Sequence, residues 1–148
     1  MDVARAKHIL STIVTIVVFA MIGVVIGWLV YQNGTYPSGV DTLCHIYKGD
    51  VLYQNISQGI LWPLYDPLWY NGVEMMRYWA PLPVYFFAVC EALAGGNPLT
   101  GFVVFCGFIF FLGAISWLYV GQKVKRRRLG IFLGILWFFM PNNLIALF

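Results

Sequence analysis

Asp41 and His45 are the first residues of this chain whose types and spacing could do chemistry. Side chains four residues apart lie one turn apart on one face of a helix, so a helix here would present both together. A carboxylate can take or orient the proton of a hydroxyl group, which makes that hydroxyl a better nucleophile. His45 could orient Asp41 or bind a metal ion beside it. The structural alternatives are that Asp41 caps the helix and that His45 only makes hydrogen bonds.

The segment from Gly59 to Tyr85 adds polar candidates among four prolines and many aromatic rings. Arg77 could grip a phosphate group, because the guanidinium fork matches phosphate oxygens. The alternative for Arg77 is a structural role at the membrane interface. Its side chain would then either extend its charge to the water or make a cation–π contact with Trp79. Glu74 is a second acidic candidate for contact with a metal ion or an acceptor. Asp66 is expected to fix a turn.

Aromatic side chains gather in the same segment, and such rings favour burial or the membrane–water boundary. Two of them, Trp62 and Tyr78, are candidates for contact with a substrate, since a ring can stack on the face of a sugar. The simpler interpretation is an interfacial belt, which would consist of Trp62, Trp69, Tyr70, Trp79 and Tyr85.

The composition indicates the kind of protein that must position these residues. Of 148 residues, 61% are hydrophobic and 10% are charged, whereas soluble domains average about 25% charged residues. The chain is therefore predicted to be an integral membrane protein. Seven of the nine basic residues stand before the first apolar segment or just before the last: Arg5, Lys7, Lys123, Lys125, Arg126, Arg127 and Arg128. Cytoplasmic anchoring explains basic residues beside membrane helices, so no nucleic-acid partner is expected.

Hydropathy divides the chain into five parts. Residues 1–31 hold a cytoplasmic amino terminus and a first transmembrane helix, whose apolar run from Ile9 to Tyr31 is long enough for a hydrocarbon core of roughly 30 Å. Residues 32–98 form an extracytoplasmic loop, 99–121 a second transmembrane helix, 122–128 a basic cytoplasmic turn, and 129–148 a third transmembrane helix. The position of the basic residues sets this orientation.

Two helices are expected inside the loop, and the first covers Asp41 to Ser57. The second, Leu82 to Gly95, is short for a span and contains Glu91, and a crossing there would place the basic turn on the wrong side. We expect it to lie at the outer surface, with a crossing as the alternative. The predicted fold is an all-α membrane protein with about three transmembrane helices and an extracytoplasmic loop containing juxtamembrane helices.

The last apolar segment stops at Phe148 without a polar flank. Transmembrane helices usually finish with interfacial or charged residues. We therefore expect this sequence to be the amino-terminal part of a longer protein, and a small subunit completed by partner helices is the alternative.

Three motifs carry a resemblance to known proteins: Gly39-Val40-Asp41 with His45, the stretch from Gly59 to Gly72, and the stretch from Tyr78 to Tyr85. In this order they resemble the amino-terminal portion of the GT-C fold glycosyltransferases. The chain most resembles bacterial membrane proteins described as 6-pyruvoyl-tetrahydropterin synthase-related. Pterin chemistry itself is not expected, because that soluble enzyme needs a cluster of histidines and this chain has two.

GT-C enzymes are polytopic membrane proteins that move sugars from polyprenyl-phosphate carriers. Their first outward loop supplies an acidic residue that acts as a base or helps to hold a divalent metal ion. By this resemblance Asp41, with His45, is the catalytic candidate, and Asp41 is also the candidate ligand of an Mg²⁺ or Mn²⁺ cofactor. The candidates for substrate binding are Arg77, Glu74, Trp62 and Tyr78.

The resemblance also implies partners and a location. The expected partners are membrane lipid, a polyprenyl-phosphate sugar donor and further membrane helices or subunits, and the expected location is a bacterial or archaeal cytoplasmic membrane. GT-C enzymes have many more spans than the three predicted here, so these residues alone are not expected to be active. The competing function is that of a non-catalytic membrane subunit whose aromatic loop docks lipid or a partner protein. A transporter ranks third, because the clear spans contain no ionisable residue.

Overall fold

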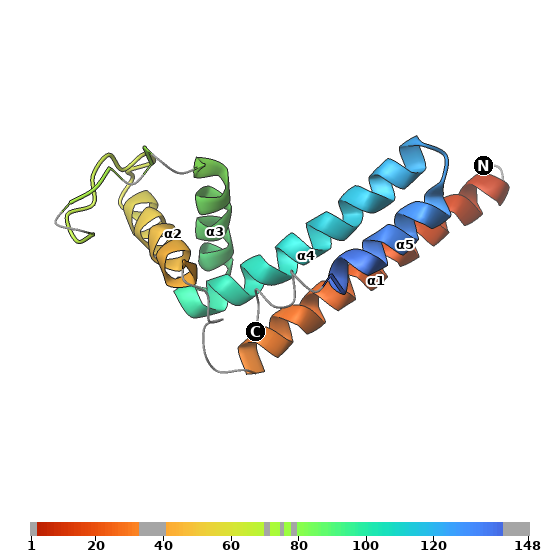
Figure 1. Ribbon diagram of the computed structural model, residues 1–148, viewed down its shortest axis with the longest axis horizontal. Helices are drawn as coiled ribbons and strands as arrows, with labels where there is room; N and C mark the ends of the chain where they lie inside the picture. The colour runs from red at the N-terminus through yellow and green to blue at the C-terminus, as the bar shows by residue number, and fades with distance from the viewer. Residues whose placement is uncertain (1–2, 33–40, 70–71, 75, 78–79, 141–148) are drawn as a thin grey trace. The chain divides into compact units, whose positions relative to one another are not determined.

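A computed structural model describes residues 3–32, 41–69, 72–74, 76–77 and 80–140 of the chain, without the side chain of Ala4. Within these ranges the protein is all-α, as predicted. The helices are α1 (Val3–Gln32), α2 (Thr42–Ser57), α3 (Pro81–Leu93), α4 (Pro98–Lys123) and α5 (Arg127–Phe138) (Figure 1).

The chain divides into two compact units. The first, called here the long-helix unit, comprises Met1–Asn33 and Cys106–Phe148, and so contains α1, most of α4 and α5. The second, called the hairpin unit, comprises Gly34–Phe105 and contains α2, α3 and the first turns of α4.

Two helices are long and apolar enough to cross a membrane, and they match the first two predicted spans. They are α1, over Arg5–Gln32, and α4. Many of their apolar side chains are exposed, such as Val24 at 71%, which a lipid environment would cover. The third predicted span, 129–148, begins within α5, but residues 141–148 lie outside the described part of the chain. That span therefore stays a prediction.

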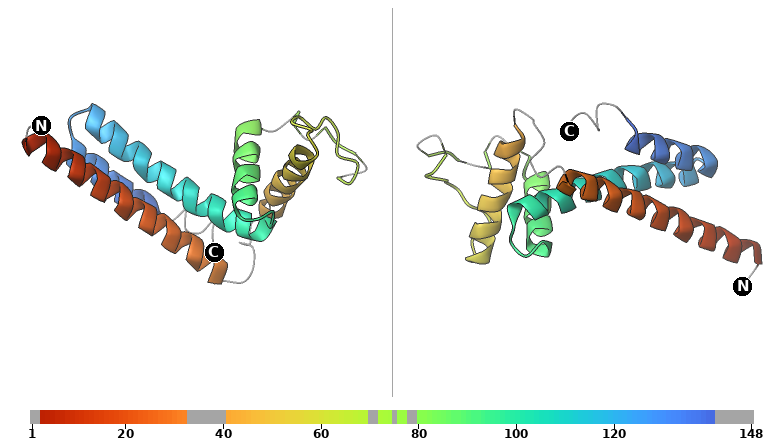
Figure 2. Two further views of the ribbon diagram at one scale, coloured as in Figure 1. Left: turned by 180° about the vertical axis from the view of Figure 1, so that it is seen from behind. Right: turned by 90° about the horizontal axis from the view of Figure 1, so that it is seen from below.

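Glycines set the packing within the long-helix unit, where α5 lies along α4 and α1 crosses them at an angle (Figure 2). A Cβ atom on Gly23 of α1 would lie 2.8 Å from the carbonyl oxygen of Gly107 on α4, so this crossing requires glycine. Phe19 of α1 meets Phe138 of α5 edge-on, with ring centroids 5.8 Å apart. Membrane helices associate through this kind of close backbone and side-chain contact, because lipid gives no hydrophobic drive for their association.

The hairpin unit buries a small core between α2 and α3. Its buried members are Leu52, Met76, Val84 and Ala88. The absence of a side chain at Gly49 makes room for the ring of Phe87, which a Cβ atom there would overlap. This core explains why α2 keeps its helical form despite a glycine, which weakens isolated helices.

Proline and glycine set the limits of α3. Pro81 stands at its first position, where the missing N–H costs no hydrogen bond. Gly95 and Gly96 follow its end with φ of 73° and 79°, a conformation that favours glycine. The helix therefore has 13 residues, and both Pro81–Leu93 and Thr42–Ser57 fall where the sequence predicted loop helices. The position of α3 at a membrane surface stays a prediction.

Candidate functional site

Asp41 occupies the N-cap position of α2, as the structural alternative required, yet its side chain makes no capping hydrogen bond. The carboxylate is exposed instead, and only the backbone of Asp41 joins the helix, through its carbonyl oxygen 3.1 Å from the backbone nitrogen of His45. His45 is also exposed. The first turn of α2 therefore carries an exposed carboxylate and an exposed imidazole four residues apart, and their joint action stays a prediction.

A shallow groove of about 400 Å³ lies along the same part of α2. It is lined by Leu43, Cys44, Tyr47, Leu68 and Trp69. The rings of Tyr47 and Trp69 stand 4.8 Å apart between centroids, which gives the groove an aromatic wall. A surface of this kind suits the apolar face of a sugar or a lipid chain better than a highly charged ligand.

A buried lysine adjoins this groove on α2. Lys48 is 5% exposed, and its ammonium nitrogen lies 5.4 Å from the centroid of the Trp69 ring, in cation–π contact. Burial lowers the pKa of Lys48, and the charges of Cys44 and Asp41 oppose this shift. The cation–π contact therefore places a cation beside the aromatic wall of the groove.

Asp66 fixes a turn, as predicted, and also ties the loop to α2. One carboxylate oxygen accepts a hydrogen bond from the backbone nitrogen of Leu68 (3.0 Å), and the other accepts one from the hydroxyl of Tyr47 (2.8 Å). The backbone of Asp66 exchanges two further hydrogen bonds with Val73. Burial, with the hydrogen bond to Asp66, raises the pKa of Tyr47 to about 12. Asp66 is 4% exposed, so its role is to hold the loop.

The predicted substrate-binding residues form pairs. Arg77 and Glu74 make an exposed ion pair, with a guanidinium nitrogen 2.9 Å from a carboxylate oxygen. Trp62 stacks on Tyr85, with ring centroids 6.3 Å apart, and the hydroxyl of Tyr85 donates to the carbonyl oxygen of Leu61. Tyr78 lies outside the described residues, as do Tyr70 and Trp79 of the predicted belt.

Glu91 on α3 is a candidate that the sequence analysis missed. Its side chain is 0% exposed, and it interacts with the carboxyl group of Asp50 on α2. Burial raises the pKa of Glu91 to about 7, and the neighbouring carboxyl group of Asp50 on α2 contributes to the rise. Such a group can take up or release a proton near neutral pH. The sequence held a signal, because Glu91 continues the helical spacing of the buried residues Val84 and Ala88.

The residues that could hold the expected divalent metal ion do not form a complete site. Among the described residues, no three His, Cys, Asp or Glu side chains come together. Asp41 could supply one ligand, and Mg²⁺ and Mn²⁺ need several oxygen ligands.

The second half of the chain matches the model of a protein family. No curated protein and no solved structure matches the chain. Residues 76–148 match the model of a family described as "6-pyruvoyl-tetrahydropterin synthase related domain; membrane protein". The matched residues include α3, α4 and α5 but exclude Asp41 and His45. The second half of the chain is therefore similar to this membrane-protein family, which supports the family named from the sequence motifs.

Proposed function

We propose that the chain is the amino-terminal module of a polytopic, GT-C-like glycosyltransferase. It would move a sugar from a polyprenyl-phosphate donor to an acceptor outside the cytoplasm. The observation that carries the proposal is the exposed carboxylate of Asp41, which stands at the start of α2 beside the aromatic groove and makes no capping bond. A residue used only as a cap would direct that carboxylate at the backbone N–H groups of its own helix.

The proposed reaction is an inverting transfer. The acceptor hydroxyl forms a bond to the anomeric carbon of the sugar while the bond from that carbon to the carrier phosphate breaks. Asp41 takes the proton of the hydroxyl, and the polyprenyl phosphate leaves with the bonding electrons. His45, one turn further on, orients the carboxylate. The rings of Tyr47 and Trp69 offer a face on which the sugar can stack.

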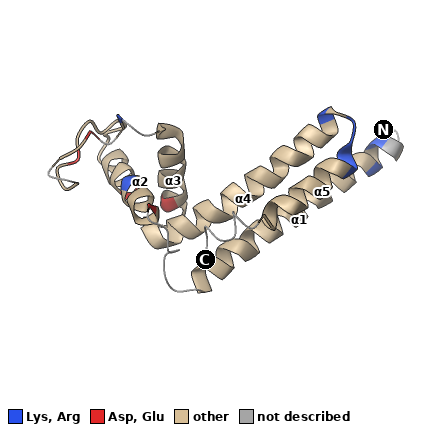
Figure 3. Ribbon diagram, viewed as in Figure 1, with Lys and Arg blue, Asp and Glu red and all other residues tan. Residues whose placement is uncertain are grey.

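The proposed orientation follows from the basic residues. Cations gather at one end of the long-helix unit (Figure 3), and positively charged membrane-helix ends usually stay in the cytoplasm. The opposite end of α1, at Gln32, then emerges outside, and α2 follows it in the chain. Asp41 would thus meet the extracytoplasmic acceptor and donor.

The second candidate is a non-catalytic membrane subunit whose loop docks lipid or a partner protein. It is favoured by a run of exposed large side chains in the loop, including Leu64 at 73% and Leu68 at 83%. Contiguous exposed apolar surface commonly marks an interaction site. The two candidates differ in their dependence on Asp41, because docking through Leu64 and Leu68 does not need a base.

The deciding experiment compares variants of Asp41 in the full-length protein. Purified protein is given a polyprenyl-phosphate-linked sugar, and transfer to the acceptor is measured as kcat and KM. We expect Asp41→Asn to lower kcat by about 10²–10⁴-fold, the usual contribution of a general base, and to leave KM within a few fold. Asp41→Glu keeps the carboxylate and should retain part of the activity.

The matched control is Gln54→Ala, which changes an exposed side chain on the same helix and should leave kcat unchanged. Full activity of Asp41→Asn would remove Asp41 from the mechanism. If wild-type protein transfers no sugar, while Leu64→Ser with Leu68→Ser releases it from lipid or from a copurifying protein, the second candidate is correct.

A further inference from the structure

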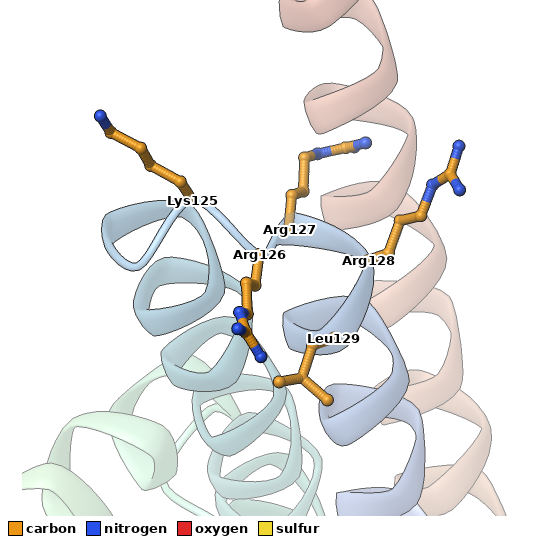
Figure 4. A pocket seen from close by; sticks show the side chains of 5 residues that line it. All are labelled: Lys125, Arg126, Arg127, Arg128 and Leu129. Atoms are coloured by element: carbon orange, nitrogen blue, oxygen red, sulfur yellow. The ribbon is translucent and has the colours of Figure 1, made fainter.

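The turn between α4 and α5 is lined almost entirely by cations. A pocket of about 560 Å³ lies there, and its lining is Lys125, Arg126, Arg127, Arg128 and Leu129 (Figure 4). Neither the transfer reaction nor the docking loop uses this pocket. It belongs to the long-helix unit, whose described residues contain no Asp or Glu to neutralise these charges.

The backbone fixes the place of these charges. Helix α4 ends with the backbone nitrogen of Arg126 bonded to the carbonyl oxygen of Gly121 (2.8 Å) and that of Lys125 bonded to Gln122 (3.1 Å). This is the Schellman arrangement, in which the residue after the cap adopts a left-handed conformation and is usually glycine. Here that residue is Lys125, with φ of 57°. The turn therefore keeps a cation at a position that favours glycine.

The first turn of α5 carries positive side chains, whereas negative side chains stabilise the first turn of a helix. The amino end of a helix carries partial positive charge, so acidic residues stabilise the first turn. The first turn of α5 has no acidic residue and holds Arg127 and Arg128, and Arg126 at the N-cap gives no side-chain cap. An anion bound in the turn would satisfy both the side chains and the unbonded N–H groups.

One of the four cations already has a structural role. A guanidinium nitrogen of Arg127 donates to the hydroxyl of Thr15 on α1 at 3.2 Å, which holds α5 against α1. The side chains of Lys125, Arg126 and Arg128 are exposed and project from the turn in different directions (Figure 4). These three are therefore available to a ligand.

We propose that the α4–α5 turn binds the phosphate-bearing headgroup of an anionic membrane lipid. The site follows α4, a helix long and apolar enough to cross a membrane, so headgroups would surround it. Val124 (56% exposed) and Leu129 (45% exposed) flank the cations and offer apolar contact to an acyl chain. A free phosphate ion would use the cations and leave these side chains in water, so the lipid is the better fit. The proposal is independent of the transfer reaction.

The test measures lipid binding by the full chain, purified in an uncharged detergent. Native mass spectrometry counts bound phosphatidylglycerol and bound phosphatidylcholine during titration. Wild-type protein should prefer phosphatidylglycerol. The triple variant K125Q/R126Q/R128Q should bind phosphatidylglycerol at least about tenfold more weakly, since each basic side chain near an anionic surface contributes to binding. Arg127 is left intact because of its bond to Thr15.

The matched control, R5Q/K7Q/K123Q, removes three cations of the same unit that do not line the pocket. It should lose less than about threefold in affinity if the pocket, and not the total charge, binds the headgroup. Equal losses in the two triple variants would overturn the proposal, as would a wild-type protein without preference for phosphatidylglycerol. Displacement of the lipid by a small excess of inorganic phosphate would identify the ligand as phosphate alone and would also overturn it.

A single substitution separates binding from folding. Lys125→Gly removes one cation and relieves the left-handed lysine, so it should preserve helix content and weaken phosphatidylglycerol binding severalfold. Unchanged binding in this well-folded variant would show that Lys125 does not hold the headgroup, and the proposed site would fail.

Discussion

The long-helix unit and the hairpin unit place their polar groups in different ways. In the long-helix unit the charged residues stand at one end, while the helices touch through glycines and aromatic rings (Figure 3). In the hairpin unit the charged side chains of Lys48, Asp66 and Glu91 are buried. Buried polar groups cost free energy unless they are paired, so a small helical hairpin gains no stability from Glu91 as it stands. The buried charged side chains that the structure describes therefore all lie in the hairpin unit.

The largest effect is expected from removal of the apolar side chain on which the hairpin core depends. Leu52 is 0% exposed and packs with Met76, Val84 and Ala88. We expect Leu52→Ala to lower the local unfolding free energy of the hairpin unit by about 2–5 kcal/mol, because it leaves a cavity. Hydrogen exchange of the α2 and α3 amides measures this change. Exchange in α1 should stay the same if the two units are stabilised separately.

The control for that prediction is Leu64→Ala, which shortens a side chain that is 73% exposed. It should change the local unfolding free energy obtained from hydrogen exchange by less than about 0.5 kcal/mol. Loss of protection in α1 to the same extent as in α2 would contradict the separation of the two units. The comparison between them would then have to be abandoned.

The buried carboxyl group of Glu91 makes the hairpin sensitive to pH. Its pKa is raised from 4.5 in the unfolded chain to about 7 in the folded one, so the folded state binds the proton more tightly. The hairpin is therefore most stable below about pH 4.5 and loses stability as the pH rises to about 7. Above about pH 7 this group changes the stability no further. Glu91→Gln should remove this slope and stabilise the hairpin above pH 7 by roughly 3 kcal/mol at most.

The measurement is hydrogen exchange of α2 and α3 between pH 5 and pH 8, corrected for the intrinsic exchange rates. Glu74→Gln, which removes an exposed carboxylate of the same unit, should keep the wild-type pH slope. A flat wild-type profile would show that Glu91 is ionised and paired in the protein, and the contrast between the two units would become much weaker.

Asp66 tests whether a buried charge in the hairpin unit stabilises the loop. Asp66→Asn keeps the shape of the side chain but removes the negative charge of the carboxylate, which accepts hydrogen bonds from Tyr47 and Leu68. It should lower the unfolding free energy by about 1–3 kcal/mol. It should also move the pKa of Tyr47 from about 12 back toward 10, without reaching it, because burial is the larger cause of the shift. NMR titration of the tyrosine ring measures this pKa. A tyrosine that still titrates near 12 would show that Asp66 does not interact with it.

Much of this architecture could be predicted from hydropathy and turn residues. The apolar runs that became α1 and α4 are long and uninterrupted, and the prolines and glycines around α3 mark its ends. The pairings within the site could not be predicted in this way. Tyr47 and Asp66 meet across 19 residues because the loop folds back on α2, and spacing along one helix carries no information about such a contact.

Predictions for individual site residues agreed with the structure where they depended only on residues close by in the sequence. The turn at Asp66 and the shared helical turn of Asp41 and His45 depend on neighbours in sequence, and both are present. The environment of Glu91 depends on the packing of α2 on α3, so the sequence could place it on the buried face but could not provide its neighbour Asp50. The catalytic role of Asp41 stays a prediction.

The smallest expected effect concerns the α4–α5 turn of the long-helix unit, where the charged side chains of Lys125, Arg126 and Arg128 are exposed. Lys125→Gly should stabilise the turn by about 1 kcal/mol, because a left-handed conformation costs an ordinary residue about that much and glycine almost nothing. Lys123→Gly removes the same charge two residues earlier, inside the last turn of α4, and should destabilise by about 1 kcal/mol. Thermal unfolding in detergent compares the two variants at equal net charge. If both variants raise thermal stability, relief of repulsion between cations, and not backbone conformation, controls the turn.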